Sequence, residues 1–442
     1  MIHSTRSTQS YSIFEAIEKG LASDGGLFVI DEFKKVNLNA LKDLSYHELV
    51  IEILKDYIPG IDKIISETYP DFEIKVKTFD NYAYLELFHG PTLAFKDVAL
   101  SFLPFFLDNK RIVVATSGDT GSATLSGFKN KKNISVTVLY PNNLVSPLQE
   151  RQMLYFTNER NSALALNGNF DDCQKLAKEL ALKDKNLSSA NSINIGRLLP
   201  QIIYYFYGYF SLVRENKIKM NEIIDIVVPT GNFGNILAGY IAKDMGLPVD
   251  TLISASNENK VLYDFIKTGI YDSNREFKKT YSPSMDILVS SNIERLIYYF
   301  YKDVNKVSEL YDEFKRTGKM QIKEYRDLFK DFDSAYVTNI EVLKEIKHEY
   351  QEKNYLIDPH TAVAKCAYNK VGKNNYTLIL STASPFKFED ALKDAGINMN
   401  EFEMPDNLKC VLKDNKQKIV VEKEDVEKYI YKGGKNVWKR LK

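Results

Sequence analysis

The stretch Ile223-Ile-Asp-Ile-Val-Val-Pro-Thr-Gly-Asn-Phe-Gly-Asn235 passes from an apolar run directly into a glycine-rich loop. The run up to Val228 is typical of a buried strand, and the residues from Ile236 to Met245 favour a helix that stops at Gly246 and Pro248. A glycine-rich loop between a strand and a helix start can bind an anion, because its backbone amides and the helix dipole both present positive charge. It has neither the Gly-Lys-Ser/Thr ending of a nucleoside-triphosphate loop nor dinucleotide spacing, and a structural turn without a ligand is the alternative.

Apolar runs alternate with helical patterns on both sides of this loop. Further buried strands are predicted at Ile112 to Ala115, Ile134 to Leu139 and Tyr376 to Leu380. Strands that alternate with helices favour βαβ units, and hence an α/β fold whose parallel sheets are covered by helices on both faces. The chain of 442 residues has room for about two to four structural units.

Two flanking regions follow other patterns. Before about Asp80 the sequence favours two helices, Phe14 to Leu21 and Leu44 to about Tyr57, so we expect a small N-terminal helical unit. The region from about Glu258 to Glu352 is richer in Lys, Glu, Asp and Tyr, with a helix-like stretch from Ile293 to Tyr301. We interpret this region as a solvated helical excursion on the surface.

The composition describes a soluble globular protein, with 44% hydrophobic and 27% charged residues and a formal net charge of zero. Zero net charge gives no overall attraction to nucleic acid or to an acidic membrane. The three cysteines have no metal-ligand spacing, which fits a reducing compartment and predicts no metal site. The N-terminus is polar and the longest apolar stretch is short. We therefore expect a cytoplasmic protein that binds neither nucleic acid nor membrane.

The segment His89-Gly-Pro-Thr-Leu-Ala-Phe-Lys-Asp97 sets one lysine, Lys96, among apolar residues just past a Gly-Pro turn. Burial against Leu93, Phe95 and Val98 would lower the pKa of this lysine, as a nucleophilic amine requires. The alternative is a lysine at a helix start whose stem packs while its amine reaches water.

Two other loops offer groups for anions. Thr116-Ser-Gly-Asp-Thr-Gly-Ser-Ala123 follows a predicted strand and supplies hydroxyls and glycine amides for a carboxylate or phosphate. Asp119 would repel such an anion unless it points elsewhere or caps the helix. Ala190-Asn-Ser-Ile-Asn-Ile-Gly-Arg197 places amides, a hydroxyl and a guanidinium before an apolar helix, a set that suits bidentate recognition of phosphate.

Two polar segments lie near the C-terminal end of the predicted sheet region. Asp358-Pro-His-Thr-Ala362 contains His360, for which a capping or packing role is the alternative to catalysis. Leu380-Ser-Thr-Ala-Ser-Pro-Phe-Lys387 follows a strand directly, at the end where open α/β sheets place their ligands.

Together these segments resemble the threonine synthase family, pyridoxal-phosphate enzymes of the tryptophan-synthase-β-like fold, and the resemblance covers nearly the whole chain. It rests on Ser4-Thr-Arg with Gly20 to Phe28, His89 to Asp97, Ser117 to Gly121, Asn191 to Asn194 with Arg197, Gly231 to Asn235, Asp358 to Thr361, and Thr382-Ala. The Ser-Gly-Asp-Thr-Gly loop and the charged excursion resemble the bacterial and fungal branch. The implied fold is α/β, PLP fold type II, with two parallel-sheet three-layer domains and the N-terminal unit.

The resemblance also implies an organisation of the chain. It predicts an N-terminal unit at residues 1–80, a cofactor-binding catalytic region at 81–390, and a C-terminal extension at 391–442. Within the catalytic region we expect a smaller inserted subdomain at about 98–210 and the charged excursion at about 258–352.

The site residues that the resemblance implies fall into three groups. Lys96 is the catalytic residue, bonded to pyridoxal phosphate as a Schiff base and then acting as the base that moves protons. The cofactor phosphate is held by Gly231, Asn232, Phe233, Gly234 and Asn235, and Thr382 bonds to the pyridine nitrogen. The substrate carboxylate is held by Ser117, Gly118, Asp119, Thr120 and Gly121, the substrate phosphate by Ser192, Asn194 and Arg197, and Asn191, His360 and Thr361 complete the substrate site.

The implied activity is that of a carbon–oxygen lyase acting on phosphates. O-phospho-L-homoserine and water would give L-threonine and phosphate by γ-elimination and β-addition, the last step of threonine biosynthesis, in a monomer or homodimer. The alternatives are a threonine-synthase-like phospho-lyase, a serine/threonine dehydratase of the same fold, and a non-catalytic cofactor-binding regulatory protein. Ser384 and Phe386 depart from the family pattern beside Thr382 and predict a reshaped pocket.

Overall fold

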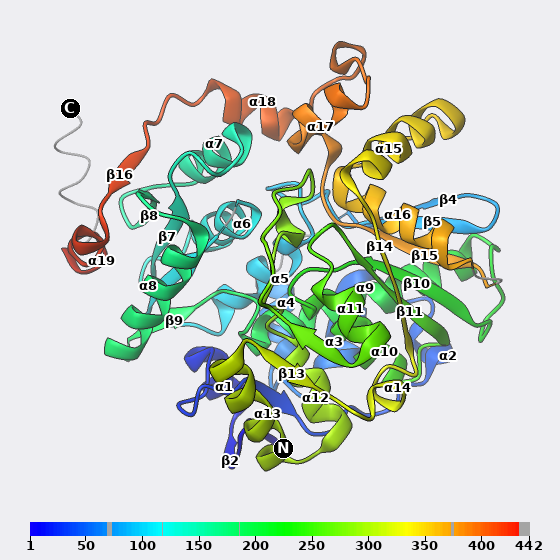
Figure 1. Cartoon of the computed structure of the whole chain (residues 1–442), viewed down its shortest axis with the longest axis horizontal. Helices are drawn as coiled ribbons and strands as arrows, with labels where there is room; N and C mark the ends of the chain where they lie inside the picture. Colours follow the sequence, from blue (N-terminus) through cyan, green and yellow to red (C-terminus); the bar gives the residue numbers. More distant parts are fainter. Residues whose placement is uncertain (69–72, 117, 185, 373–374, 433–442) are drawn as a thin grey trace.

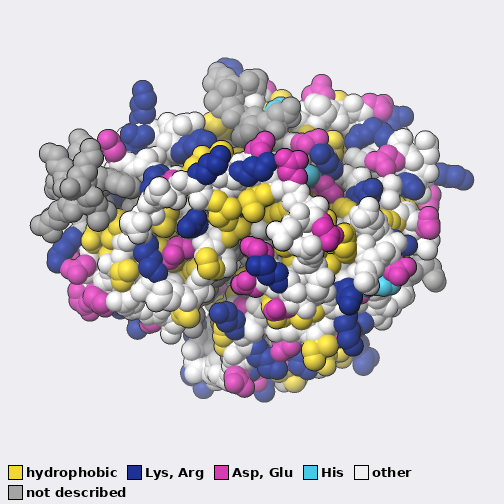
Figure 2. Space-filling view, turned by 90° about the horizontal axis from the view of Figure 1, so that it is seen from above, with side chains coloured by type: hydrophobic (Ala, Val, Ile, Leu, Met, Phe, Trp, Pro, Cys, Tyr) yellow, Lys and Arg dark blue, Asp and Glu magenta, His cyan; other side chains and the backbone are white. Residues whose placement is uncertain are grey.

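Two sheets with helices packed around them form the body of the molecule (Figure 1). The computed structural model describes residues 1–68, 73–116, 118–184, 186–372 and 375–432. The α/β class with parallel sheets is confirmed. Among the described residues no helix is long and apolar enough to cross a membrane. On the face drawn in Figure 2, basic and acidic side chains are interspersed.

The larger sheet has the strand order β14-β11-β10-β15-β5-β4, in which only β4 runs antiparallel to its neighbour. Its strands are β4 (Lys75–Thr78), β5 (Tyr82–Glu86), β10 (Ile224–Pro229), β11 (Val249–Ser256), β14 (Phe332–Tyr336) and β15 (Thr377–Ser381). Strands β10 and β15 are buried along their whole length, as expected for parallel strands covered on both faces. The strands predicted from Ile223 and from Tyr376 are therefore confirmed.

The smaller sheet is parallel throughout, with the order β16-β8-β7-β6-β9. Its strands are β6 (Arg111–Ala115), β7 (Ser135–Pro141), β8 (Asn161–Leu166), β9 (Leu187–Ser189) and β16 (Ile419–Val421). The predicted strands from Ile112 and Ile134 correspond to β6 and β7. Because β16 pairs with β8, the C-terminal extension supplies the edge of this sheet and is not a separate body.

Helices cover the sheets and fill the space between them (Figure 1). They are α1 (Ile13–Lys19), α2 (Leu38–Leu41), α3 (Tyr46–Leu54), α4 (Ile61–Thr68), α5 (Lys96–Phe102), α6 (Asp119–Phe128), α7 (Pro147–Tyr155), α8 (Phe170–Lys183), α9 (Ile195–Arg214), α10 (Gly234–Asp244), α11 (Val261–Thr268), α12 (Ile293–Tyr301), α13 (Val304–Thr317), α14 (Tyr325–Leu328), α15 (Asn339–Lys353), α16 (Pro359–Val371), α17 (Glu389–Asp394), α18 (Asp406–Lys413) and α19 (Val426–Lys432).

The N-terminal unit contains the predicted helices and also a small antiparallel sheet that the sequence did not predict. Its strands are β1 (Ile2–Ser4), β2 (Ser7–Tyr11) and β3 (Phe28–Ile30), in the order β2-β1-β3. Strands of three to five residues are too short to show a period-two pattern. The description of this unit as helical is therefore incomplete.

The interpretation of residues 258–352 as a solvated surface excursion is wrong in two respects. Strand β14 from this region forms the edge of the larger sheet, next to β11. The predicted helix from Ile293 to Tyr301 exists as α12, but its residues up to Tyr298 are buried. Charged side chains on outer helices such as α13 dominate the composition of the region, and they hid its buried elements.

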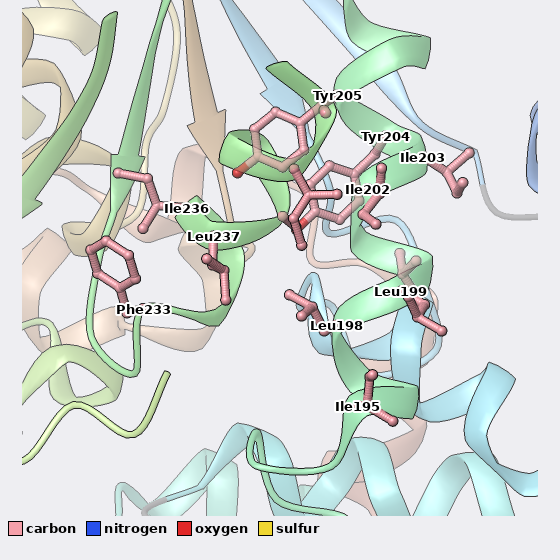
Figure 3. Packing of buried hydrophobic residues seen from close by; sticks show 14 of the residues in the cluster. Ile195, Leu198, Leu199, Ile202, Ile203, Tyr204, Tyr205, Phe233, Ile236 and Leu237 are labelled. Carbon is pink, nitrogen blue, oxygen red and sulfur yellow. The ribbon is translucent and has the colours of Figure 1, made fainter. Parts of the chain in front are cut away.

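Helix α9 is the central helix of the site region, and nearly all of its residues are buried. Figure 3 shows apolar side chains along α9, such as Leu198 and Ile202, in the same packed region as Ile236 and Leu237 at the start of α10. Full burial of each such side chain contributes roughly 1.5–3 kcal/mol to folding. The apolar contact between α9 and α10 fixes the glycine-rich loop relative to Arg197.

Candidate active site

Lys96 is the first residue of α5, and its side chain is only 12% exposed. The amine donates a hydrogen bond to Ser284 Oγ at 3.1 Å and lies 3.8 Å from Asp119 Oδ2. Burial lowers the pKa of Lys96 to about 8; Asp119 opposes the shift, whereas Lys387 and Arg197 add to it. The amine therefore does not reach bulk water as a solvated helix-start lysine would.

The turn before Lys96 is attached to the segment that carries Thr382. Phe95 donates its backbone N–H to Thr382 O at 2.9 Å. The turn is closed by Asp97, whose carboxylate accepts bonds from the N–H and the hydroxyl of Thr92 at 2.8 and 2.7 Å. Thr382 is buried, and within the described residues its hydroxyl has no hydrogen-bond partner. It is available to a ligand beside Lys96.

Asp119 does not cap helix α6, because Gly118 is the capping residue and makes no side-chain bond there. The Asp119 carboxylate instead forms an ion pair with Lys387 at 2.6 Å and accepts a bond from Gln149 Nε2 at 2.9 Å. Burial alone would raise the pKa of Asp119, but Lys387 and Lys96 hold it well below its usual range. The suggested capping role is therefore wrong, and the carboxylate points to Lys387 and Gln149, as it must if this loop is to bind an anion.

The rest of the Ser117–Gly121 loop is partly committed to internal bonds. Ser117 lies outside the described residues. The backbone N–H groups of Gly118 and Gly121 both donate to Thr116 Oγ1, at 2.9 and 3.2 Å. Among the described residues nothing bonds to the Thr120 hydroxyl, which leaves it as the free side-chain donor of this loop.

The glycine-rich loop presents backbone amides and one unpaired side-chain donor. Phe233 has φ +61° and is buried in the core, so only its backbone faces a ligand. Asn235 Oδ1 accepts bonds from the hydroxyls of Tyr204 and Tyr205 at 2.5 and 2.8 Å. Its Nδ2 is buried and has no partner among the described residues. A buried unpaired donor at the N-terminus of α10 fits a bound phosphate group.

Gly231 cannot carry a larger side chain, since a Cβ there would lie 2.7 Å from Ser284 O and 3.3 Å from Met285 Cα. Gly231→Ala should push the loop away from the segment that contacts Lys96. We expect the affinity for pyridoxal phosphate to fall about tenfold or more, measured by absorbance titration. Gly234→Ala is the comparison, because its Cβ would meet only the end of the Asn292 side chain at 3.3 Å. Equal affinities in the two variants would contradict the prediction.

Arg197 is buried, and among the described residues its guanidinium has no acidic partner. Its side chain donates to Ala190 O at 2.7 Å, while Nε has no partner among the described residues. Burial lowers the pKa of Arg197 to about 10. A buried cation without a counter-ion is costly, so this position is suited to bind an anion.

The side chain of Asn194, predicted to bind the substrate phosphate, is occupied by bonds within the protein. Both amide hydrogens are donated to backbone carbonyls, to Ile17 O at 2.9 Å and to Ser189 O at 3.1 Å. The amide oxygen accepts from Gly196 N at 2.9 Å and so caps α9. Phosphate needs donors, and this amide has none left.

The other predicted substrate residues take different positions. Asn191 Nδ2 donates to Ala115 O at 2.9 Å and so joins this segment to β6, and Ser192 Oγ lies 3.2 Å from Ser291 Oγ. His360 accepts a bond from Ser284 N at its Nε2, at 3.3 Å, and contacts Asp358 through Nδ1 at 2.7 Å. His360 therefore reaches Lys96 only through Ser284. Thr361 is buried and bonds to Asp358 and Ser381.

Three parts of the chain match known families. Residues 74–382 match the family described as pyridoxal-phosphate dependent enzyme, residues 2–71 match threonine synthase N terminus, and residues 361–430 match threonine synthase, C-terminal. A threonine synthase of Saccharomyces cerevisiae is 39% identical over 494 residues, covering 96% of this chain and 95% of that protein. The chain belongs to the threonine synthase family.

Solved structures agree with this membership of the threonine synthase family. A threonine synthase from Brucella melitensis with bound PLP has a TM-score of 0.89 and 35% identity, covering 97% of this chain and 98% of that chain. A threonine synthase from yeast has a TM-score of 0.89 and 36% identity, covering 99% of this chain and 98% of that chain. The fold type is confirmed, and the chain is a pyridoxal-phosphate-dependent enzyme of threonine synthesis.

Residues that the sequence did not predict join the cofactor loop to the substrate segment. Ser290 Oγ donates to Gly231 O at 2.8 Å. Asn292 Nδ2 donates to Asn232 O at 3.0 Å and to Ser192 O at 3.3 Å. These residues precede α12, within the region for which the sequence predicts a surface excursion. The polar run Ser290-Ser-Asn292 directly before an apolar helix pattern is the signal that could have identified them.

Arg295 supports the same junction from inside the protein, and its residue is fully buried. Its guanidinium donates to Phe28 O at 2.9 Å, to Ile193 O at 2.6 Å and to Asn292 Oδ1. Arg295→Met would leave these oxygens unpaired, so we expect the free energy of unfolding to fall by about 2–4 kcal/mol. Urea denaturation measures the change.

The matched control for Arg295 is Arg326→Met on α14, because Arg326 is exposed. It should change the free energy of unfolding by less than about 0.5 kcal/mol. Equal stability changes in the two variants would show that the buried bonds of Arg295 do not hold the junction.

Proposed function

We propose that this chain converts O-phospho-L-homoserine and water to L-threonine and phosphate. The observation that carries the proposal is the buried, unpaired Nε of Arg197, in a site whose glycine loop has a second unpaired donor at Asn235. Arg197 adds to the depression of the Lys96 pKa, so its charge acts on that amine. The Asn235 donor suits the phosphate of the cofactor, and the Arg197 donor suits the phosphate of a substrate.

The residues present fit pyridoxal phosphate. The amides of the loop from Gly231, with Asn235 Nδ2, would hold its phosphate at the start of α10, and the Thr382 hydroxyl would face its ring nitrogen. When bound, the cofactor supplies an electron sink that stabilises negative charge beside the substrate amino group. A hydroxyl partner, unlike a carboxylate, leaves the ring nitrogen unprotonated and limits that sink.

The proton transfers are assigned to Lys96. With its pKa lowered to about 8, the free amine is accessible near neutral pH. Nζ can accept a proton from the α-carbon of the substrate, give that proton up again to return to the neutral amine, and then accept a proton from the β-carbon. Ser284 Oγ, at 3.1 Å from Nζ, orients the amine. Arg197 stabilises the charge of the phosphate that leaves the γ-carbon, and among the described residues of its loop Thr120 offers a free hydroxyl for the substrate carboxylate.

One assay separates this proposal from its alternatives. The chain with pyridoxal phosphate is incubated with O-phospho-L-homoserine, and phosphate, threonine and keto acid are followed in the same sample. Threonine and phosphate in equal amounts are expected. A phospho-lyase would release phosphate with a keto acid in place of threonine, a dehydratase would act on serine or threonine instead, and a regulatory protein would release none of these products.

The substrate is a small molecule. The oligomeric state of the enzyme and its location in the cell stay predictions. We propose a monomer or homodimer in the cytoplasm. Light scattering during gel filtration measures the molar mass, and a value above that of a dimer would contradict this part of the proposal.

A further inference from the structure

The site region contains a buried lysine, Lys387, that neither the proton transfers nor the phosphate contacts use directly. Lys387 ends the short 3-10 helix η3 (Pro385–Lys387), which follows β15 and Thr382. Its side chain is 0% exposed. Its Nζ donates to Thr92 O, in the turn before Lys96, at 2.8 Å. A buried lysine is costly to keep charged, so its retention here needs a physical reason.

Lys387 and Lys96 share one carboxylate, and they share it unequally. Asp119 Oδ1 lies 2.6 Å from Lys387 Nζ, whereas Asp119 Oδ2 lies 3.8 Å from Lys96 Nζ. Gln149 holds Oδ1 from another side, at 2.9 Å. The close ion pair is therefore between Asp119 and Lys387, and the nearest hydrogen-bond acceptor of Lys96 is the neutral Ser284 hydroxyl.

We propose that Lys387 is a positioning residue that suppresses protonation of Lys96, by holding Asp119 in a close ion pair and by adding its own positive charge nearby. This inference deepens the proposed function, because it concerns the amine to which the proton transfers were assigned. Without Lys387, Lys96 would be the one cationic partner left to the Asp119 carboxylate among the described residues, and the carboxylate would favour the ammonium form of Lys96.

Other ionisable groups surround Lys96, and they limit what a variant can change. They are Arg197, Asp97, Asp358 and His360. Arg197 acts in the same direction as Lys387. The Asp97 carboxylate is bonded to the turn at Thr92, and Asp358 with His360 contacts Lys96 only through Ser284. None of these four residues is substituted in the variants below. A difference in the Lys96 pKa between variants therefore reports on Lys387 and Asp119.

The test measures the protonation of Lys96 in the chain without cofactor, so it does not depend on turnover. The protein is labelled with a trace of acetic anhydride at a series of pH values, and mass spectrometry of the Lys96 peptide gives the apparent pKa. Lys387→Met is expected to raise this pKa and to slow labelling at pH 7 roughly tenfold. Asp119→Asn is expected to lower the pKa and to speed labelling.

Lys365→Met is the matched control, because Lys365 is also a buried lysine and pairs with Glu345 and Glu349 away from the site. In the Lys365→Met variant, the dependence of Lys96 labelling on pH should equal that of the unaltered chain. Opposite shifts in Lys387→Met and Asp119→Asn support the inference, and no shift or a shift in the same direction overturns it.

If the Lys387→Met chain does not fold, a second comparison tests the same inference. The double variant Asp119→Asn with Lys387→Met is compared with Asp119→Asn alone, so that the carboxylate charge is absent from both. A higher Lys96 pKa in the double variant supports the inference, and equal values overturn it. A chain that shows these shifts but makes no threonine would overturn the proposed function and leave the role of Lys387 standing.

Discussion

Lys96→Ala should lower kcat for threonine formation by roughly 10³- to 10⁴-fold or more, because the base for both proton transfers is lost. The matched variant is Lys96→Arg, which keeps a positive charge near Asp119 but carries a guanidinium that stays protonated. We expect Lys96→Arg to be as inactive as Lys96→Ala. The measurement is the rate of phosphate and threonine release from O-phospho-L-homoserine.

Two controls accompany the measurement on the Lys96 variants. Both variants should still bind pyridoxal phosphate through the loop from Gly231 to Asn235, so absorbance titration should show weakened but measurable binding. Lys365→Met, which removes a buried lysine outside the site, should keep its activity. A Lys96→Ala enzyme with more than about one tenth of the original kcat would contradict the assignment of Lys96 as base.

Arg197→Leu should raise KM for O-phospho-L-homoserine about 100-fold or more, because a buried charge-assisted contact to phosphate is lost. The affinity for pyridoxal phosphate should change little, since Asn235 and the loop amides supply that phosphate site. Steady-state kinetics at saturating cofactor and a separate cofactor titration measure the two effects.

Arg197→Lys tests the geometry of this contact. It keeps the positive charge but loses the planar pair of donors that matches phosphate, so its KM should lie between those of the original and the leucine variant. An unchanged KM in Arg197→Leu, or an equal loss of cofactor affinity, would place the substrate phosphate elsewhere in the site.

The parts of the fold that could be predicted are those with strong local signals. Buried parallel strands appear as continuous apolar runs, which is why β6, β7, β10 and β15 were identified from the sequence. The glycine loop before α10 and the turn before Lys96 also carry their signals within a few residues. The small β1 to β3 sheet has no such signal, because each strand is too short for a pattern.

The parts that could not be predicted depend on contacts between distant segments. Arg295 bonds to Phe28, which lies 267 residues away in the sequence. Lys387 pairs with Asp119 across a similar distance, and neither residue shows in its own segment that it is buried. Asn194 has the right chemistry for phosphate, but its donors are used by backbone carbonyls that only the folded chain brings near.

The most direct test of the central claim is to locate the lysine that binds the cofactor. The chain is mixed with pyridoxal phosphate and reduced with borohydride, which makes the bond to the lysine permanent, and the modified peptide is then identified by mass spectrometry. We predict a single modification, on Lys96. Modification of Lys387 or of any lysine outside this site, with Lys96 left unmodified, would contradict the claim.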